Sequence, residues 1–143
     1  MPQRADVITE LVNEIFAVNG GILAAGDALT APVGLTAAQW QVVGFLEEGP
    51  STAAELARKR GLRRQSVQET VNRLLENGMV VKLDNPADRR APLLRLTPRA
   101  RKALRELGPA RVTWASELAP RIPRADLDTT LRVLRQLREA LRP

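Results

Sequence analysis

The stretch Asn85–Pro92, NPADRRAP, carries three adjacent charges between two apolar runs. Prolines near its edges oppose a helix, and Asn-Pro favours a turn. A hairpin turn has no structural need for Asp88, Arg89 and Arg90 in a row. The stretch is therefore either a solvated loop or a site that a negatively charged partner approaches.

A second group of polar residues lies at helical spacing between residues 64 and 77. One side of this predicted helix is apolar, with Val67, Val71, Leu74 and Leu75. The opposite side has residue types that recognise base edges in the DNA major groove, where amides bind adenine, Arg binds guanine and Glu binds cytosine. An ordinary solvated helix has the same two faces, so the pattern alone does not decide. The polar residues are Gln65, Gln68, Glu69, Asn72 and Arg73.

The start of this helix favours the DNA interpretation. Arg63 and Arg64 stand where a capping residue is expected. Cations at a helix N-terminus oppose the helix dipole by ~0.3–1 kcal/mol each. A bound phosphate would turn that repulsion into an attraction. We therefore interpret Arg63 and Arg64 as phosphate contacts, with Ser66 as a third candidate.

The net charge of +6 is unevenly distributed along the chain. Residues 58–105 hold 14 Lys and Arg against 4 Asp and Glu, whereas the remaining residues hold 8 against 12. A basic middle between slightly acidic ends indicates a local site for a polyanion. A solvated charged surface is the alternative interpretation.

Composition excludes several kinds of chemistry. The chain has no Cys and no His, which removes disulfides, thiol catalysis, the commonest metal ligand and the commonest general base. Without a Gly-rich phosphate loop or paired carboxylates, we expect neither an enzyme nor a metal or cofactor site. No signal peptide is recognisable, and no apolar run approaches the roughly 18 residues of a membrane helix. We therefore expect a cytoplasmic protein that makes no membrane contact.

The elements that position these residues can be predicted from caps and periodicity. Thr36 and Thr52 each begin a helix, with Gln39 and Glu55 three residues later. Gly61 ends the second of these helices and separates it from the polar-faced helix. Residues 79–84 and 92–97 then form a two-stranded ribbon with the charged stretch at its tip. This order predicts a winged helix-turn-helix, in a mainly α fold with a small β-ribbon.

Further helices are predicted at both ends of the chain. Residues 5–23 have helical apolar spacing, with a bend or an early stop expected at Gly20-Gly21 and a loop or frayed end at residues 26–34. A helix that begins at Thr97-Pro98 should be interrupted and kinked at Gly108-Pro109. The last helix starts near Pro123 without a good cap. It carries a seam formed by Leu127, Leu131, Leu134, Leu137 and Leu141.

Together these segments resemble the MarR family of bacterial transcription regulators over nearly the whole chain. The resemblance is carried by LTAAQWQVVGFLEEG, TAAELARKRGL, RQSVQETVNRLLENGMV and DNPADRRAPLLRLTPRAR. The last segment is the most specific of the four. Arg63 departs from the family pattern, because many members have a capping Ser, Thr or Asp at this position.

The resemblance implies roles for the charged tip. The family's Asp-x-Arg pattern corresponds here to Asp88 and Arg90. It implies that Arg90 enters the DNA minor groove, while Asp88 orients that arginine or braces the wing. Arg89 is then expected to contact the DNA backbone.

The resemblance also implies assembly as a homodimer on double-stranded, pseudo-palindromic DNA, with one recognition helix in each half-site. The chain would be a single MarR-like domain, with a winged helix-turn-helix DNA-binding lobe at residues 35–105. Residues 1–30 and 109–143 would be the dimerisation helices. The expected interface residues are Ile8, Leu11, Ile15, Leu127, Leu131, Leu134 and Leu137.

Many members of the family lose DNA affinity when a small aromatic or phenolic molecule binds, so a ligand-released repressor is the leading hypothesis. Candidate pocket residues are Phe16, Trp40 and Trp114, although tryptophans are more often core or interface anchors. One alternative is a constitutive or architectural winged-helix DNA-binding protein without an effector, which ligand-dependent release would distinguish. Another is a protein-interaction module, which binding insensitive to salt would favour.

Overall fold

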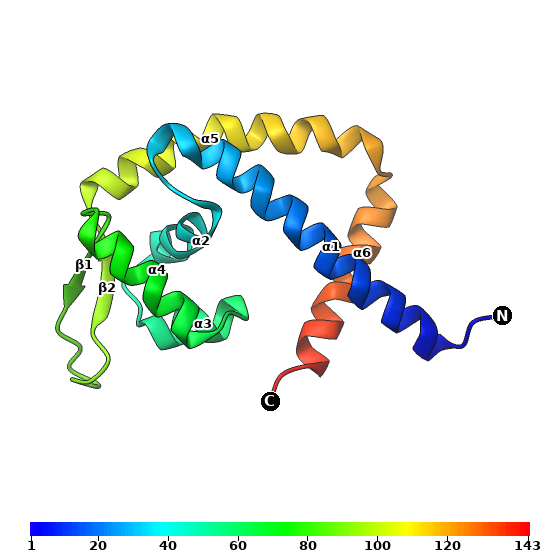
Figure 1. Ribbon diagram of the computed structural model, residues 1–143, viewed down its shortest axis with the longest axis horizontal. Helices are drawn as coiled ribbons and strands as arrows, with labels where there is room; N and C mark the ends of the chain where they lie inside the picture. The colour runs from blue at the N-terminus through cyan, green and yellow to red at the C-terminus, as the bar shows by residue number, and fades with distance from the viewer. The chain divides into compact units, whose positions relative to one another are not determined.

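The computed structural model describes residues 1–143, which form two compact units, residues 1–107 and residues 108–143. The fold is mainly helical with one two-stranded sheet, as predicted (Figure 1). Three short 3-10 segments occur at Ala31–Val33, Leu46–Glu48 and Ala119–Arg121. The regular elements are α1 (Arg4–Thr30), α2 (Ala37–Phe45), α3 (Ala53–Arg60), α4 (Arg64–Glu76), β1 (Val80–Leu83), β2 (Leu93–Leu96), α5 (Pro98–Leu118) and α6 (Arg124–Ala140).

Helix α1 is continuous through Gly20 and Gly21 to Thr30, so the predicted early stop is wrong. Of the predicted loop or frayed end, only residues 31–34 lie beyond the α-helix. The C-terminal end of the helix is fixed instead by contacts further along. The Thr30 hydroxyl donates to the Gly26 carbonyl at 2.8 Å, and the Asp27 carboxylate accepts from the Ala37 N–H at 2.7 Å. These contacts, together with packing, outweigh the roughly 1 kcal/mol that each glycine costs a helix.

The joint between α1 and α2 depends on a glycine. A Cβ atom built on Gly26 would lie 2.7 Å from the Cβ of Ala37, which is closer than side chains approach. Ala37 is the first residue of α2, so the Asp27 carboxylate also satisfies an N–H group that the helix leaves free. The end of α1 is therefore closely packed against the start of α2.

The predicted caps of α2 and α3 are confirmed. The Gln39 N–H donates to the Thr36 hydroxyl at 3.2 Å, and the Gln39 side chain accepts from the Thr36 N–H at 3.0 Å. In α3 the Glu55 N–H donates to the Thr52 hydroxyl at 3.1 Å. Gly61 ends α3 with a left-handed φ of 65°, as the sequence indicated.

A single apolar core holds the helix-turn-helix and the ribbon together. It includes the apolar side of α4 and residues of α2, α3, the ribbon and the first half of α5. Leu56, Val71 and Leu74 are almost completely buried. The polar side of α4 must therefore face away from the core, because the apolar side fixes the rotation of the helix.

Strands β1 and β2 pair antiparallel from Val80↔Leu96 to Leu83↔Leu93. We call residues 80–96 the wing, and residues 84–92, which lie beyond the last pair, the wing tip. A short bridge between Ser51 and Leu94 joins the wing to the start of α3. This bridge was not predicted from the sequence. It anchors β2 to the helix-turn-helix through two backbone hydrogen bonds, of 2.8 and 3.2 Å.

Helix α5 runs from Pro98 to Leu118 with Pro109 inside it, so the predicted interruption is wrong. Proline removes one backbone hydrogen bond, but the flanking turns keep the helix continuous. Helix α6 begins after Pro123 without a side-chain cap, as predicted. In α6, Leu131 is 49% exposed and Leu134 is 37% exposed.

The apolar surface of α1 is more extensive than the sequence analysis suggested. Val7, Ile8, Phe16, Val18 and Ile22 are all exposed. By length and composition alone, residues 4–33 could cross a membrane, and the 18-residue window with the required hydropathy contains no buried residue. The prediction that no segment approaches this length is therefore wrong. Ala and Gly residues lie between the larger apolar side chains and lengthen the stretch. The large apolar residues themselves do not form an uninterrupted run.

Candidate nucleic-acid interface

The polar side of α4 is fully available to a partner. All five residues predicted to face DNA, Gln65, Gln68, Glu69, Asn72 and Arg73, are exposed. The Gln68 amide donates to the Asn72 carbonyl oxygen at 2.9 Å, one helical turn away. This contact holds two of the predicted base-reading side chains beside each other before any partner binds.

The N-terminus of α4 has no cap. Arg63 occupies the cap position with extended backbone and no side-chain hydrogen bond. The first backbone hydrogen bond of the helix runs from the Val67 N–H to the Arg63 carbonyl at 3.0 Å. The N–H groups of Arg64, Gln65 and Ser66 therefore remain free. Three free donors and two exposed arginines form a cradle suited to an anion such as a phosphate.

The end of α3 adds further positive charge beside this cradle. Arg58 donates to the Glu55 carboxylate at 2.7 Å, and Lys59 lies 3.6 Å from the same carboxylate. The hydrogen bond from Arg58, reinforced by the two positive charges, holds the pKa of Glu55 below its ordinary value. Lys59 and Arg60 lie over the Phe45 ring, at 5.9 and 5.6 Å from its centre. Arg60 makes no ion pair, so its charge is available to a partner.

The wing tip is built from two successive turns. The Asp88 N–H donates to the Asn85 carbonyl at 3.2 Å, and the Ala91 N–H donates to the Asp88 carbonyl at 3.2 Å. The Asp88 carboxylate accepts from the backbone N–H of Arg90 at 3.0 Å. Asp88 therefore braces the backbone of the tip and makes no ion pair with a wing arginine. Of the two roles that the resemblance offered, the geometry favours bracing.

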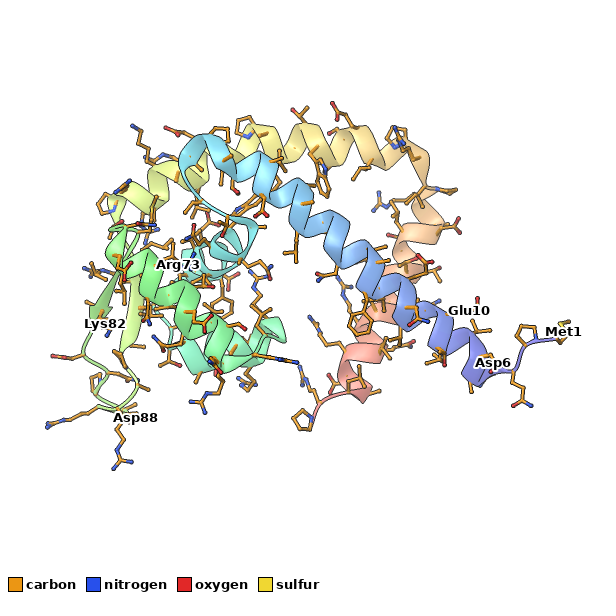
Figure 2. The ribbon with its side chains drawn as sticks, in the orientation of Figure 1. Met1, Asp6, Glu10, Arg73, Lys82 and Asp88 are labelled. Atoms are coloured by element: carbon orange, nitrogen blue, oxygen red, sulfur yellow. The ribbon has the colours of Figure 1, made fainter.

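Arg89 and Arg90, the two arginines of the wing tip, are exposed and make no ion pair. Figure 2 shows Asp88 at the far end of the ribbon, Lys82 on β1 and Arg73 on α4. Of the 14 Lys and Arg in residues 58–105, only Arg58, Lys59 and Lys102 take part in ion pairs. The basic middle of the chain is thus mostly uncompensated positive charge, carried by the helix-turn-helix, the wing and the start of α5.

Asn85 holds the backbone of the wing tip, a role that was not predicted from the sequence. Its side chain accepts from the Ala87 N–H at 3.2 Å and donates to the Ala91 carbonyl at 2.8 Å. The Asn-Pro signal indicated a turn, but it could not indicate that the amide also reaches across the tip. A shallow hollow beside it is lined by Asp84, Asn85, Pro86, Arg89 and Pro92.

The residues predicted to line a ligand pocket lie in different environments. Phe16 is 71% exposed on α1. Trp40 is partly buried and packs against the apolar core, as an anchor would. Trp114 belongs to the second compact unit and is half-buried there. The hollows at the wing tip and at Phe45 include none of these three residues.

Comparison with known proteins finds a matching protein family and proteins of similar sequence and structure. The family model described as "MarR family" matches residues 33–91. An uncharacterized protein of Mycobacterium tuberculosis (strain ATCC 25618 / H37Rv) is 31% identical over 138 residues, which are 96% of this chain and 96% of that protein. The similarity thus extends over both compact units.

Several solved structures have the same fold. The transcriptional regulator BldR from Sulfolobus solfataricus has a TM-score of 0.84 at 19% identity, over 98% of this chain and 100% of that one. A mutant MarR from E. coli complexed with operator DNA has a TM-score of 0.81 at 22% identity, over 95% and 99% of the two chains. Staphylococcus aureus MarR in complex with salicylate and kanamycin has a TM-score of 0.76 at 18% identity, over 94% and 92%.

Proposed function

Because the chain belongs to the MarR family of DNA-binding transcription regulators, we propose that it is a homodimeric repressor that a small aromatic or phenolic ligand releases from a pseudo-palindromic operator. Proteins of this family are regulators and not enzymes. The observation that carries the DNA-binding part of the proposal is the uncapped start of α4. There, two exposed arginines and three free N–H groups face outward beside a fully exposed polar helix side.

We assign two different tasks to the residues of α4. Arg63 and Arg64, with Ser66, bind phosphate and contribute affinity, because they surround the free N–H groups of the helix. Gln65, Gln68, Glu69, Asn72 and Arg73 line the outer side and contribute sequence preference, since their side chains reach the base edges when the helix lies in the major groove.

The wing has a separate task. Arg90 inserts into the minor groove, where arginine prefers the narrow, negative groove of A·T-rich DNA. Arg89 contacts the sugar-phosphate backbone. Asp88 holds the Arg90 backbone in place through the 3.0 Å hydrogen bond.

The dimer rests on apolar surface that the single chain leaves exposed or only partly covered. On α1, Ile8 is exposed, and Leu11 and Ile15 are half-buried. In the leucine seam of α6, the residues at positions 131 and 134 are exposed, and those at 127 and 137 are half-buried. Large exposed apolar patches mark association sites. A second copy of the chain would cover them, which also accounts for the apolar length of α1 without a membrane. We therefore propose a cytoplasmic location.

The effector proposal draws on chemistry and on a structural relative. The Staphylococcus aureus MarR of similar fold was solved with salicylate, an aromatic carboxylate. In this chain Phe16, Trp40 and Trp114 are the aromatic side chains that we propose for such a ligand. The alternative is a constitutive or architectural DNA-binding protein without an effector.

A binding experiment tests the proposal in two stages. The intergenic DNA beside the gene is searched for an inverted repeat, and binding to that duplex and to a scrambled duplex is measured by fluorescence anisotropy at several salt concentrations. We expect the protein to bind the inverted-repeat duplex more tightly than the scrambled duplex, with an affinity that falls steeply as the salt concentration rises. Aromatic carboxylates and phenols are then titrated into the complex. Release supports the repressor with an effector, and binding that none of the ligands alters favours the constitutive alternative.

A further inference from the structure

We propose that Asn85 is the residue that positions the wing arginines for DNA, acting as a latch that closes the wing tip. This inference rests on the proposed function, because it concerns how the wing reaches the minor groove. Asn85 itself touches no DNA in this proposal.

The wing tip lies outside the strand ladder and needs a closure of its own. The last strand pair is Leu83↔Leu93, so nine residues extend beyond it. Two backbone hydrogen bonds form the successive turns at residues 85–88 and 88–91. Each is local, and neither joins the start of the tip to its end.

The Asn85 side chain supplies that missing connection. Its Nδ2 donates to the Ala91 carbonyl at 2.8 Å, six residues along the chain, and its Oδ1 accepts from the Ala87 N–H at 3.2 Å. Both polar atoms of the amide are therefore used, and the residue is half-buried while most of the tip is exposed. Pro86 follows it directly and restricts Asn85 to extended backbone, which limits the other conformations open to the latch.

Closing the tip restricts the backbone that carries the arginines. Arg89 and Arg90 lie between the two ends that Asn85 joins, and neither has an ion pair that would hold its side chain. The direction in which each side chain leaves the tip is therefore set by the backbone of the tip. A tip that is ordered before binding loses less conformational entropy when it inserts into a groove. Asp88 braces only the second turn, whereas Asn85 braces both.

A substitution that leaves the charge of the wing unchanged separates the positioning of the arginines from their electrostatic attraction to DNA. Asn85→Ala changes no charge, so attraction to random DNA should stay the same. Binding to the operator should weaken about fivefold to tenfold, as expected when the two hydrogen bonds of this side chain are lost. Asn77→Ala is the matched control, because the exposed Asn77 side chain makes no hydrogen bond.

The decisive experiment is a double-mutant cycle with Arg90→Ala, measured by anisotropy on operator and random duplexes at one salt concentration. If Asn85 acts through Arg90, Asn85→Ala should cost about fivefold to tenfold in the wild-type background and less than about twofold in the Arg90→Ala background. Equal losses in both backgrounds, or no loss in either, would overturn the proposal. A loss that is the same on random and operator DNA would also overturn it.

A second variant guards against simple unfolding. Asn85→Asp keeps the acceptor for the Ala87 N–H but loses the donor to the Ala91 carbonyl. The substitution also adds one negative charge, which weakens binding to operator and to random DNA alike. The effect of this charge therefore cancels in the ratio of the two affinities. This ratio should fall as it does in Asn85→Ala, while the thermal midpoint stays at the wild-type value; an unchanged ratio would contradict the latch. If the wild-type protein prefers no DNA sequence at all, the proposed function fails as well. If it prefers the operator and Asn85→Ala does so equally, only the latch is wrong.

Discussion

Replacing Arg63 by Ser should stabilise the fold and weaken DNA binding at the same time. Arg63 is the uncapped start of α4, and its cation faces the positive end of the helix. A serine at this position can accept from the free N–H of Ser66, three residues later, as Thr36 and Thr52 do for their helices. The two effects of the substitution on stability have the same sign.

The size of each effect follows from the geometry. A new N-cap contributes about 1 kcal/mol, and removing the cation relieves ~0.3–1 kcal/mol of repulsion from the helix dipole. For a chain of 143 residues, each 1 kcal/mol raises the Tm by about 2–4 °C, so the combined gain of about 1.3–2 kcal/mol corresponds to about 3–8 °C. DNA binding should weaken on every sequence alike, with the salt slope smaller by about one for each lost phosphate contact.

Calorimetry or circular dichroism measures the stability, and anisotropy over a salt series measures the binding. Arg4→Ser is the matched control, because it removes the same charge from the exposed start of α1, far along the chain from α4. This control should leave DNA binding unchanged. An Arg63→Ser protein that binds DNA as tightly as the wild type would refute the phosphate role. An unchanged Tm would refute the account of the missing cap.

Three further predictions follow from other parts of the molecule. Leu131→Glu combined with Leu134→Glu should give monomers in analytical ultracentrifugation that bind DNA poorly, and a monomeric wild type at micromolar concentration would disprove the dimer. Arg73→Ala should relax preference at one base pair by ~1–3 kcal/mol, whereas Arg64→Ala should weaken all sequences equally; identical behaviour of the two variants would contradict the division of tasks. Gly26→Ala should destabilise the fold by about 1–3 kcal/mol in urea unfolding, because the added Cβ would lie 2.7 Å from the Cβ of Ala37. Gly20→Ala, whose added Cβ would meet nothing within 4 Å, should instead stabilise the fold by up to about 1 kcal/mol.

The parts of the fold that the sequence predicted correctly have local causes. Thr36, Thr52 and Gly61 act within one helical turn, so their roles as caps and stops could be inferred from spacing alone. The ribbon and the uncapped start of α4 could likewise be predicted from residues that are close together in the sequence. The helix-turn-helix and its wing could therefore be predicted almost element by element.

The parts that were missed depend on contacts between distant residues. The position of the C-terminal end of α1 depends on Asp27 and Gly26 meeting Ala37, ten or more residues away, which no local propensity predicts. The Ser51 bridge to β2 is longer in range still. In the wing, the acidic and basic residues were recognised by type, whereas Asn85 acts through an amide that reaches six residues along the chain.

The most direct test of the account is a footprint of the protein on DNA selected from a random pool. We expect a selected pseudo-palindrome whose half-site centres lie about one helical turn, ~34–36 Å, apart. Major-groove protection should lie within each half-site, with minor-groove protection by the wings at A·T-rich outer edges that disappears in Arg90→Ala. A pool that yields no common sequence, or binding that does not weaken as salt is raised, would contradict the claim that α4 and the wing of this chain recognise a DNA operator.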